Sequence, residues 1–504
     1  MKKIFAITMA ILLMAAAFCF ATTAEGDSGY AMRVSGLKGG EDTPIVIQNY
    51  STPVEGWEAA IDFARDCDYM RDNGYVRIVV DLLVDWNATD GEFCNSGDGF
   101  EWDAIYFYPE TKITLNMHGH TIDRGLTSYN WSGEVMYIAK DADVIINGGK
   151  PGDDIIGPED EADESKMGTI TGGFSSNGAG GIHIDDGATV VLNNVCLDKN
   201  AVEDDKGSAL AMYDGVDFTM NGGRISENRV TKFNDAWEKA EGTVFVDDST
   251  AVFNKVTFSK NDANGSYGAA VSVNGNSSVT LNGCLVEEHG ADRDDWFDSV
   301  FYTDDRECVL TLKDTDVIDN GTKYPGNDFD ASAIFNITGT LYINNDCLIK
   351  GNKTTTIFAI TRYSSFTDSS YCHVHASNST FVDNNAQMFY YNGDMEGSYS
   401  LNFTNCTLNK NLGKWETYTF ASHSAVPITF TDCSLGNTSH ENGKNVKIVD
   451  TDASNGAPVA SLFGTGSIAM IVSLVALIAS AASIVVNVTS KKKEAHNGTN
   501  NDGK

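Results

Sequence analysis

Residues 189–200 read TVVLNNVCLDKN, and residues 217–228 repeat the same apolar and polar pattern as DFTMNGGRISEN. Leu192 in the first stretch corresponds to Met220 in the second, and we use Leu192 as an anchor position. Equivalent anchors recur every 27 to 33 residues, at Leu192, Met220, Phe253, Leu281, Leu312, Ile343, Ala376, Phe403 and Phe430. A period of this length indicates repeated supersecondary units.

Each repeat predicts three short strands joined by corners. The residues two positions before each anchor and five positions after it are apolar, which indicates buried strand positions. The residues five positions after the anchors are Leu197, Ile225, Phe258, Val286, Val317, Leu348, Phe381, Leu408 and Leu435. Asn, Asp or Gly stands two residues past eight of the nine anchors, and such residues tolerate a left-handed corner. The position eight residues past the anchor is asparagine in most repeats, and this residue marks a second corner. A third strand lies upstream, as in residues 182–184.

One repeat cannot bury its apolar side chains alone, because its strands have no partners within the unit. Stacked on its neighbours, each strand pairs in parallel with the equivalent strand above and below. The expected fold class is therefore all-β, a right-handed parallel β-helix in which corner asparagines stack from coil to coil. A β-propeller is disfavoured because its blades need roughly 40 to 45 residues.

Several motifs resemble known β-helix families. Residues 405–411 (NCTLNKN) and 258–261 (FSKN) resemble the FxxN repeats of the chlamydial polymorphic outer-membrane proteins, and residues 180–182 (GGI) resemble their GGAI repeats. This resemblance covers roughly residues 168–440 and implies a surface-exposed, adhesin-like β-helix. Residues 113–122 (ITLNMHGHTI) resemble the opening coil of pectate-lyase-like β-helices.

The region before the repeats predicts a cap. Trp57, Ala60 and Ile61 recur at helical spacing and Gly74 follows as a stop, so residues 56–73 predict one amphipathic helix. Such a helix would cover the open end of the parallel strands, which otherwise invites aggregation. Residues 76–84 predict the first strand.

The two ends predict export and membrane attachment. Residues 1–24 have the basic start, apolar middle and small-residue end of a signal peptide, and residues 468–488 are 21 uncharged residues followed by three lysines. Residues 462–466 (LFGTG) resemble a sortase signal with phenylalanine in place of proline, so wall attachment stays an alternative. The predicted parts are 1–24 signal peptide, 25–110 cap region, 111–450 β-helix, 451–467 linker, 468–488 transmembrane helix and 489–504 cytoplasmic tail.

Charge limits the partners. The chain has 35 basic and 70 acidic residues, a formal charge of −35, which would repel a nucleic-acid backbone. A cell-surface, single-pass membrane protein is expected, and its partner would be a polysaccharide or a host or envelope glycoprotein. The sequence does not set the oligomeric state.

The sequence singles out no catalytic residue. β-Helix lyases and hydrolases need clustered basic or carboxylate groups on one outer face, and the neighbouring pairs 185–186, 204–205 and 294–295 are interpreted as solvating aspartates. His373 and His375 share one outward strand face, yet no third metal ligand is placed beside them. No cofactor is predicted, and no spaced acidic loop supports calcium.

Histidines and cysteines near the repeats are interpreted as structural. His118 and His120 are expected to be packed or hydrogen-bonded. Several cysteines recur near one repeat position, which favours small buried packing residues over a disulfide framework. Cys406 and Cys433 are the one adjacent pair close enough to bridge.

Aromatic residues between or beside the predicted strands are the remaining lead for ligand binding. The candidate residues are Trp237, Trp296, Tyr363, Tyr390, Tyr391 and Trp415, with packing over the coils as the alternative. Two hypotheses follow. The first is a non-enzymatic, adhesin-like or glycan-binding surface protein. The second is a surface-tethered polysaccharide lyase or glycoside hydrolase of the pectate-lyase-like fold.

Overall fold

The structure is a computed structural model that describes residues 29–87, 104–160, 163, 166–231, 241–264, 267–290, 299–321, 333–361, 371–392, 398–409, 411, 427–436 and 446–451. The chain divides into two units, residues 1–449 and 450–504. The predicted signal peptide, the sortase-like motif at 462–466, the membrane span at 468–488 and the tail lie outside the described residues and stay predictions. No helix among the residues that the structure describes is long and apolar enough to span a bilayer.

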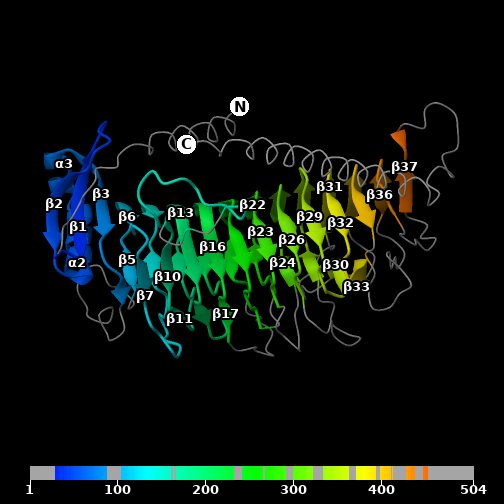
Figure 1. The fold of residues 1–504 in the computed structure, drawn as a ribbon, viewed down its shortest axis with the longest axis horizontal. Helices are drawn as coiled ribbons and strands as arrows, with labels where there is room; N and C mark the ends of the chain where they lie inside the picture. The colour runs from blue at the N-terminus through cyan, green and yellow to red at the C-terminus, as the bar shows by residue number, and fades with distance from the viewer. Residues whose placement is uncertain are drawn as a thin grey trace, which may run out of the picture. The chain divides into compact units, whose positions relative to one another are not determined.

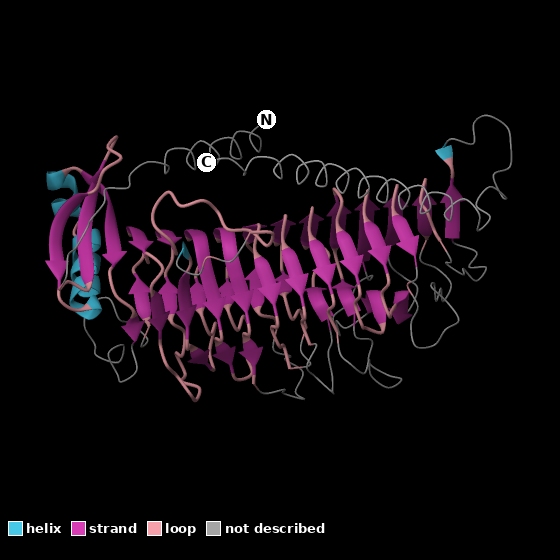
Figure 2. Ribbon diagram, viewed as in Figure 1, coloured by secondary structure: helices cyan, strands magenta, loops and turns pink. Residues whose placement is uncertain are grey.

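The first unit is a β-solenoid built from three sheets, which we call A, B and C (Figures 1 and 2). Sheet A has 24 strands, and its long strands are β1 (Met32–Lys38), β2 (Ile45–Tyr50), β3 (Tyr75–Leu82), β6 (Lys112–Asn116), β9 (Asp143–Asn147), β13 (Thr189–Asp198), β16 (Asp217–Ser226), β19 (Thr250–Asn254), β22 (Ser278–Asn282), β25 (Val309–Lys313), β28 (Thr340–Asn344), β31 (Tyr371–Ser377), β34 (Ser398–Thr404), β36 (Ile428–Thr431) and β37 (Val446–Val449). Its short strands are β4 (Trp86–Asn87), β7 (Thr121–Asp123), β10 (Gly168–Thr171), β20 (Thr257–Ser259), β23 (Leu285–Glu287), β26 (Asp316–Ile318), β29 (Leu348–Lys350), β32 (Thr380–Val382) and β35 (Thr407–Asn409).

Sheets B and C complete the coils. Sheet B has ten strands: β5 (Ile105–Phe107), β8 (Met136–Ile138), β12 (Ile182–Ile184), β15 (Leu210–Met212), β18 (Val244–Asp247), β21 (Val271–Asn274), β24 (Ser299–Thr303), β27 (Ala333–Ile337), β30 (Thr356–Thr361) and β33 (Gln387–Asn392). Sheet C has three: β11 (Phe174–Ser175), β14 (Ala201–Val202) and β17 (Arg229–Val230). Strands of sheet B pair in parallel with the equivalent strand of the next coil, as the solenoid prediction requires.

The predicted register is confirmed at every anchor. Leu192 pairs with Met220, Met220 with Phe253, and Phe253 with Leu281, and the pairing continues coil by coil to Phe430. All nine anchors are buried. All nine residues two positions past the anchors have a φ between 47° and 63°, so the left-handed corner is confirmed even where Lys255 occupies it.

One predicted register is wrong. Val317 pairs with Ile349, not with Leu348, and Leu348 is only partly buried. The corner before it holds two left-handed residues, Asn345 and Asp346, and is one residue longer than the equivalent corner at Asp314. This extra residue shifts the following strand by one position, and a shift of one residue reverses which side chains face inward.

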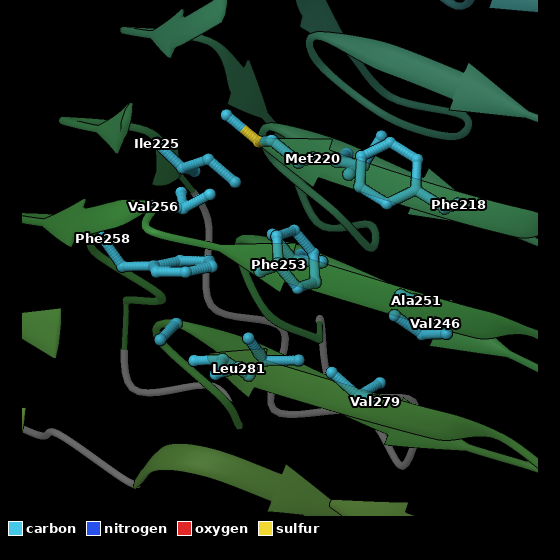
Figure 3. Packing of buried hydrophobic residues seen from close by; sticks show 14 of the residues in the cluster. Phe218, Met220, Ile225, Val246, Ala251, Phe253, Val256, Phe258, Val279 and Leu281 are labelled. Atoms are coloured by element: carbon cyan, nitrogen blue, oxygen red, sulfur yellow. The ribbon is translucent and has the colours of Figure 1, made fainter. Parts of the chain in front are cut away.

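The core is a continuous column of apolar side chains between the sheets. Figure 3 shows Phe253 between Met220 of the preceding coil and Leu281 of the next. The Phe253 ring centroid lies 5.5 Å from that of Phe218 and 5.2 Å from that of Phe258. Burying a side chain of this size contributes about 1.5–3 kcal/mol to stability.

A second column consists of buried asparagines at the corner after the short strands of sheet A. In the coil of Asn320, the Nδ2 atom donates to the Val286 carbonyl at 2.9 Å, while the backbone N–H donates to Oδ1 of Asn352 at 3.0 Å. The members are Asn200, Asn228, Asn261, Asn320, Asn352, Asn384 and Asn411, with His289 in the place of one asparagine. The column satisfies corner backbone groups that would otherwise be buried without partners.

Two helices form where one was predicted. Helix α2 (Pro53–Arg65) buries Trp57, Ala60 and Ile61, and α3 (Cys67–Asn73) ends at the left-handed Gly74. The prediction of one helix is wrong because Asp66 ends α2 and caps α3, its side chain accepting from the Tyr69 N–H at 2.8 Å.

Helix α2 lies against the first coils, with the Trp57 ring 4.8 Å from that of Phe107. The strands that precede it, β1 and β2, were not predicted. They join sheet A antiparallel, ahead of β3.

Candidate functional site

Aromatic rings form a stack on the outer face of sheet B. In β12, Ile182 and Ile184 point into the core, so His183 between them points outward. Its ring lies 4.5 Å from that of Tyr137 on one side and 5.0 Å from that of Tyr213 on the other. Tyr106 extends the stack beyond Tyr137, at 5.2 Å.

The stack is a structural feature and leaves no ring face for a sugar at its centre. The planes of Tyr137 and His183 are within 9° of parallel, and those of Tyr106 and Tyr137 within 13°. Both faces of the Tyr137 and His183 rings are therefore covered by other rings. Burial lowers the pKa of His183 to about 4, so the imidazole is neutral at pH 7.

Carboxylates gather beside this stack around one lysine. Asp247 of β18 pairs with Asn274 of β21, and Asp304 directly follows Thr303, which pairs with Val273. Asp247, Asn274 and Asp304 thus form a column on three successive coils. Lys206 lies on the same face, with its Nζ 4.5 Å from the centre of the Phe245 ring and 4.0 Å from Oε1 of Glu241.

Glu241 and Asp304 have contrasting environments. The Glu241 side chain is 13% exposed, and its Oε2 is buried without a hydrogen-bond partner in the structure. Burial raises the pKa of Glu241 to about 7; Lys206 and the Asn274 side chain oppose this rise, while the charges of Asp304 and Asp247 add to it. Asp304 is exposed and accepts a hydrogen bond from the Tyr302 hydroxyl at 2.7 Å; desolvation raises its pKa as well, and this hydrogen bond opposes the rise.

Asp205 also belongs to this face, which corrects its interpretation as a solvating charge. It is partly buried and accepts hydrogen bonds from the backbone N–H groups of Gly178 and Lys206, both at 2.8 Å. We call Lys206, Asp205, Glu241, Asp247 and Asp304 the sheet B cluster. Within the described part of the chain, no three His, Cys, Asp or Glu side chains are arranged to hold a metal ion.

The structure tests little of the predicted aromatic site. Trp237, Trp296, Tyr363 and Trp415 lie outside the described residues. Tyr390 and Tyr391 belong to strand β33, where their backbones pair with Ala359 and Ile360 of β30. These two residues thus belong to a six-residue strand of sheet B and do not lie between strands, and their role in ligand binding stays a prediction.

A different pair of aromatic residues is exposed on a fixed loop. Tyr129 is 53% exposed and Trp131 is 66% exposed. The residue between them, Asn130, bridges in parallel to Ser175 of sheet C, donating to the Phe174 carbonyl at 2.9 Å and accepting from the Ser176 N–H at 3.0 Å. The Tyr129 ring packs edge-on against Phe174, with 6.4 Å between the ring centroids, and Trp131 begins the turn that follows Asn130.

Sequence reasoning missed this pair because the loop carries no repeat signal. Residues 124–134 lie between the short strand β7 and sheet B, in a coil whose anchor pattern is irregular. The available signal was the sequence Tyr-Asn-Trp at 129–131, two large aromatics flanking a turn-forming asparagine in a polar connection.

The histidines noted in the sequence have structural partners. Nε2 of His118 lies 2.9 Å from Asp81, and Nδ1 of His120 lies 3.2 Å from Asp85, which confirms the expected hydrogen bonding. The rings of His373 and His375 are 6.5 Å apart and nearly parallel, with an angle of 10° between their planes. Nitrogen lone pairs lie in the ring planes, so parallel rings do not converge on one metal ion.

Comparison with protein-family models, with curated proteins and with solved structures found no match for this chain.

Proposed function

We propose that this protein is a non-catalytic cell-surface β-solenoid that binds glycans through exposed aromatic rings. The observation that carries the proposal is the Tyr129 and Trp131 pair, held in place by backbone hydrogen bonds of Asn130 yet more than half exposed. Aromatic side chains on a backbone that is already fixed lose little conformational entropy when a sugar ring packs on them. The partner is a polysaccharide or the glycan of a surface glycoprotein.

The surface location rests on the sequence. The signal peptide at 1–24 would export the chain, and the apolar segment at 468–488 with its lysines would hold it in a membrane with the solenoid outside. The resemblance to polymorphic outer-membrane proteins supports a surface role, and helix α2 would act as the cap of the first coil. Residues 462–466 keep wall attachment as an alternative.

Glycan binding by the purified protein tests the proposal. We expect Trp131→Ala to weaken binding to a glycan-array hit about tenfold or more, equivalent to about 1.4 kcal/mol, and Tyr129→Ala to weaken it less. Tyr30→Ala is the matched control, because Tyr30 is 45% exposed and precedes strand β1, away from the loop of Trp131. Unchanged binding by the Tyr129, Trp131 double variant would refute the assignment.

A second candidate function is glycoside hydrolysis, and Glu241 is the observation that favours it. Glu241, a largely buried carboxyl with a pKa near 7, lies on the same face as the exposed Asp304, whose pKa desolvation also raises, and two carboxyls in different environments are what a general acid and its partner base or nucleophile need. Glu241 would protonate the leaving oxygen. Release of reducing ends from neutral or acidic polysaccharides, lost in Glu241→Gln and kept in the exposed control Asp217→Asn, would establish it.

A further inference from the structure

Two cysteines face each other on adjacent coils near the last described strands of sheet A. Cys406 follows β34 and Cys433 follows β36, and the bridge between Thr407 and Ser434 places the two cysteines in register. The Ser434 N–H donates to the Cys406 carbonyl at 2.9 Å. The Cys406 N–H points to Sγ of Cys433 at 3.4 Å.

The spacing of adjacent coils suits a disulfide. Parallel strands lie about 4.8 Å apart, within the roughly 4.4–6.8 Å that Cα atoms need for a disulfide. All eight described cysteines are free thiols. Only Cys406 and Cys433, among these eight, occupy equivalent positions on neighbouring coils.

Other cysteines that share a corner are separated by an intervening coil. Thr315 stands between Cys284 and Cys347, its Oγ1 accepting from the Cys284 N–H and its own N–H pointing to the Cys347 sulfur. Two coil steps are about 10 Å, too far for a bridge. Cys284 and Cys347 therefore serve as internal controls.

The two thiols differ in reactivity. Cys406 is buried, whereas Cys433 is partly exposed. The Cys406 thiol beside it lowers the pKa of Cys433, because an S–H donor stabilises the neighbouring thiolate. Cys433 is thus the thiol that a soluble reagent meets first and the one of the two that ionises more readily.

We propose that Cys406 and Cys433 form a disulfide that ties the last coils of sheet A together. With a small disulfide RSSR as oxidant, the Cys433 thiolate attacks one sulfur, forming a mixed disulfide and releasing RS⁻. The Cys406 thiol then loses its proton and attacks Sγ of Cys433, releasing the second RS⁻. The balance is one protein dithiol and one RSSR giving one protein disulfide and two RSH.

The bond would reinforce the end of the solenoid. The two cysteines are 27 residues apart, so the bond closes a loop that spans one full coil. In the described residues sheet B ends at β33, while sheet A continues through β36 and β37. Closing this loop lowers the population of the unpaired end by roughly a hundredfold. The inference does not depend on the proposed glycan binding.

The test uses the full chain, purified reduced and then incubated with oxidised glutathione at pH 8. We expect the count of alkylatable thiols to fall by two and a non-reducing digest to contain a peptide linking Cys406 to Cys433. Cys433→Ser and Cys406→Ser should abolish the linked peptide, while Cys284→Ser should keep it. A serine already fills the same corner as Ser379, so these variants are compatible with the fold.

The same samples report the structural effect. Limited proteolysis of the region after residue 406 should slow by roughly a hundredfold on oxidation and return to the initial rate with a reducing agent. The proposal is overturned if oxidation leaves only a glutathione adduct on Cys433, with Cys406 still alkylatable. It is also overturned if the linked peptide joins other cysteines.

Discussion

Replacing His289 with asparagine should stabilise this protein. His289 occupies an asparagine position in the buried corner column, where its Nδ1 accepts the Asn261 N–H at 3.1 Å. The proton must then sit on Nε2, and Nε2 is buried with no hydrogen-bond partner in the structure. In the neighbouring coil, Asn320 uses its Nδ2 to reach the Val286 carbonyl instead.

The gain follows from two opposing contributions. An unsatisfied buried N–H costs about 1–3 kcal/mol, and asparagine removes this cost by donating to the carbonyl of Phe258, the counterpart of Val286. Asparagine is smaller by about 40 Å³, and a cavity of that size costs about 1 kcal/mol. His289→Asn should therefore raise the free energy of unfolding by about 1 kcal/mol at pH 7.

Lowering the pH should increase the difference in the free energy of unfolding between the His289→Asn variant and the original chain. Burial lowers the pKa of His289 to about 3, below the ordinary value of 6.5. Between these values the unfolded chain binds a proton that the folded chain does not, so the stability is complete above pH 6.5 and falls as the pH drops towards 3. At pH 5 the loss is about 2 kcal/mol, and the asparagine variant does not suffer it.

Chemical denaturation at pH 7 and pH 5 measures both effects. The variant should exceed the original chain by about 1 kcal/mol at pH 7 and by about 3 kcal/mol at pH 5. His375→Asn, on the outer face of sheet A, controls for the loss of a histidine. His183 shifts in the same direction and is present in both proteins, so it cancels in the comparison. A variant that is less stable at both pH values would refute this account of the column.

Three further changes have defined outcomes. Phe253→Ala, in the centre of the core, should lower the free energy of unfolding by about 3–5 kcal/mol in urea denaturation. Gly223→Ala should prevent correct packing of β16, seen as loss of soluble protein, because Gly223 has a φ of 81° and a Cβ there would meet the Val195 carbonyl oxygen at 2.1 Å. Glu241→Gln should stabilise the protein by about 2–3 kcal/mol at pH 8 and should not stabilise it at pH 4. The pKa of Glu241 is raised in the folded chain, so the stability that its protonated form contributes is fully present below pH 4.5 and is lost as the pH rises through 7.

The sequence contained the register because each coil repeats the same side-chain requirement. A buried anchor and a left-handed corner recur on each of the nine repeats, and a buried asparagine recurs on most of them, so the agreement of many repeats fixes the register even where one repeat departs from the pattern. The insertion of a single residue into one corner cannot be predicted from the repeat pattern. Asp346 is aspartate in a corner that already favours Asn and Asp, and only the pairing of Val317 with Ile349 reveals it as an extra residue.

The candidate site could not be predicted for a related reason. Glu241 and Asp304 are 63 residues apart and belong to different coils, and their proximity depends on how irregular connections leave and rejoin sheet B. Strands β1 and β2 were missed because they pair antiparallel outside the repeat. Trp131 was missed because an exposed aromatic residue leaves no periodic signal.

The asparagines on the outer face of sheet A hydrogen-bond to one another and are therefore poor candidates for ligand binding. Six asparagines form an external ladder in which each Nδ2 donates to Oδ1 of the preceding coil, at 2.8 to 3.3 Å: Asn282, Asn254, Asn221, Asn193, Asn147 and Asn116. The last donates to the carboxylate of Asp81, which His118 also contacts. Aligned amides polarise one another, and the carboxylate lies at the donor end where it strengthens the chain.

A ladder that satisfies its own donors and acceptors has little left to offer a ligand. The same register that stabilises the coils thus occupies the repeating asparagines of this face, because each one is already hydrogen-bonded to its own copy on the next coil. Ligand chemistry has to come from residues that break the repeat. Trp131 lies on a loop outside the repeating coils. Glu241 lies just before strand β18, and its Oε2 is buried without a hydrogen-bond partner. These departures from periodicity, and not the periodic residues, are where mutation should separate function from folding.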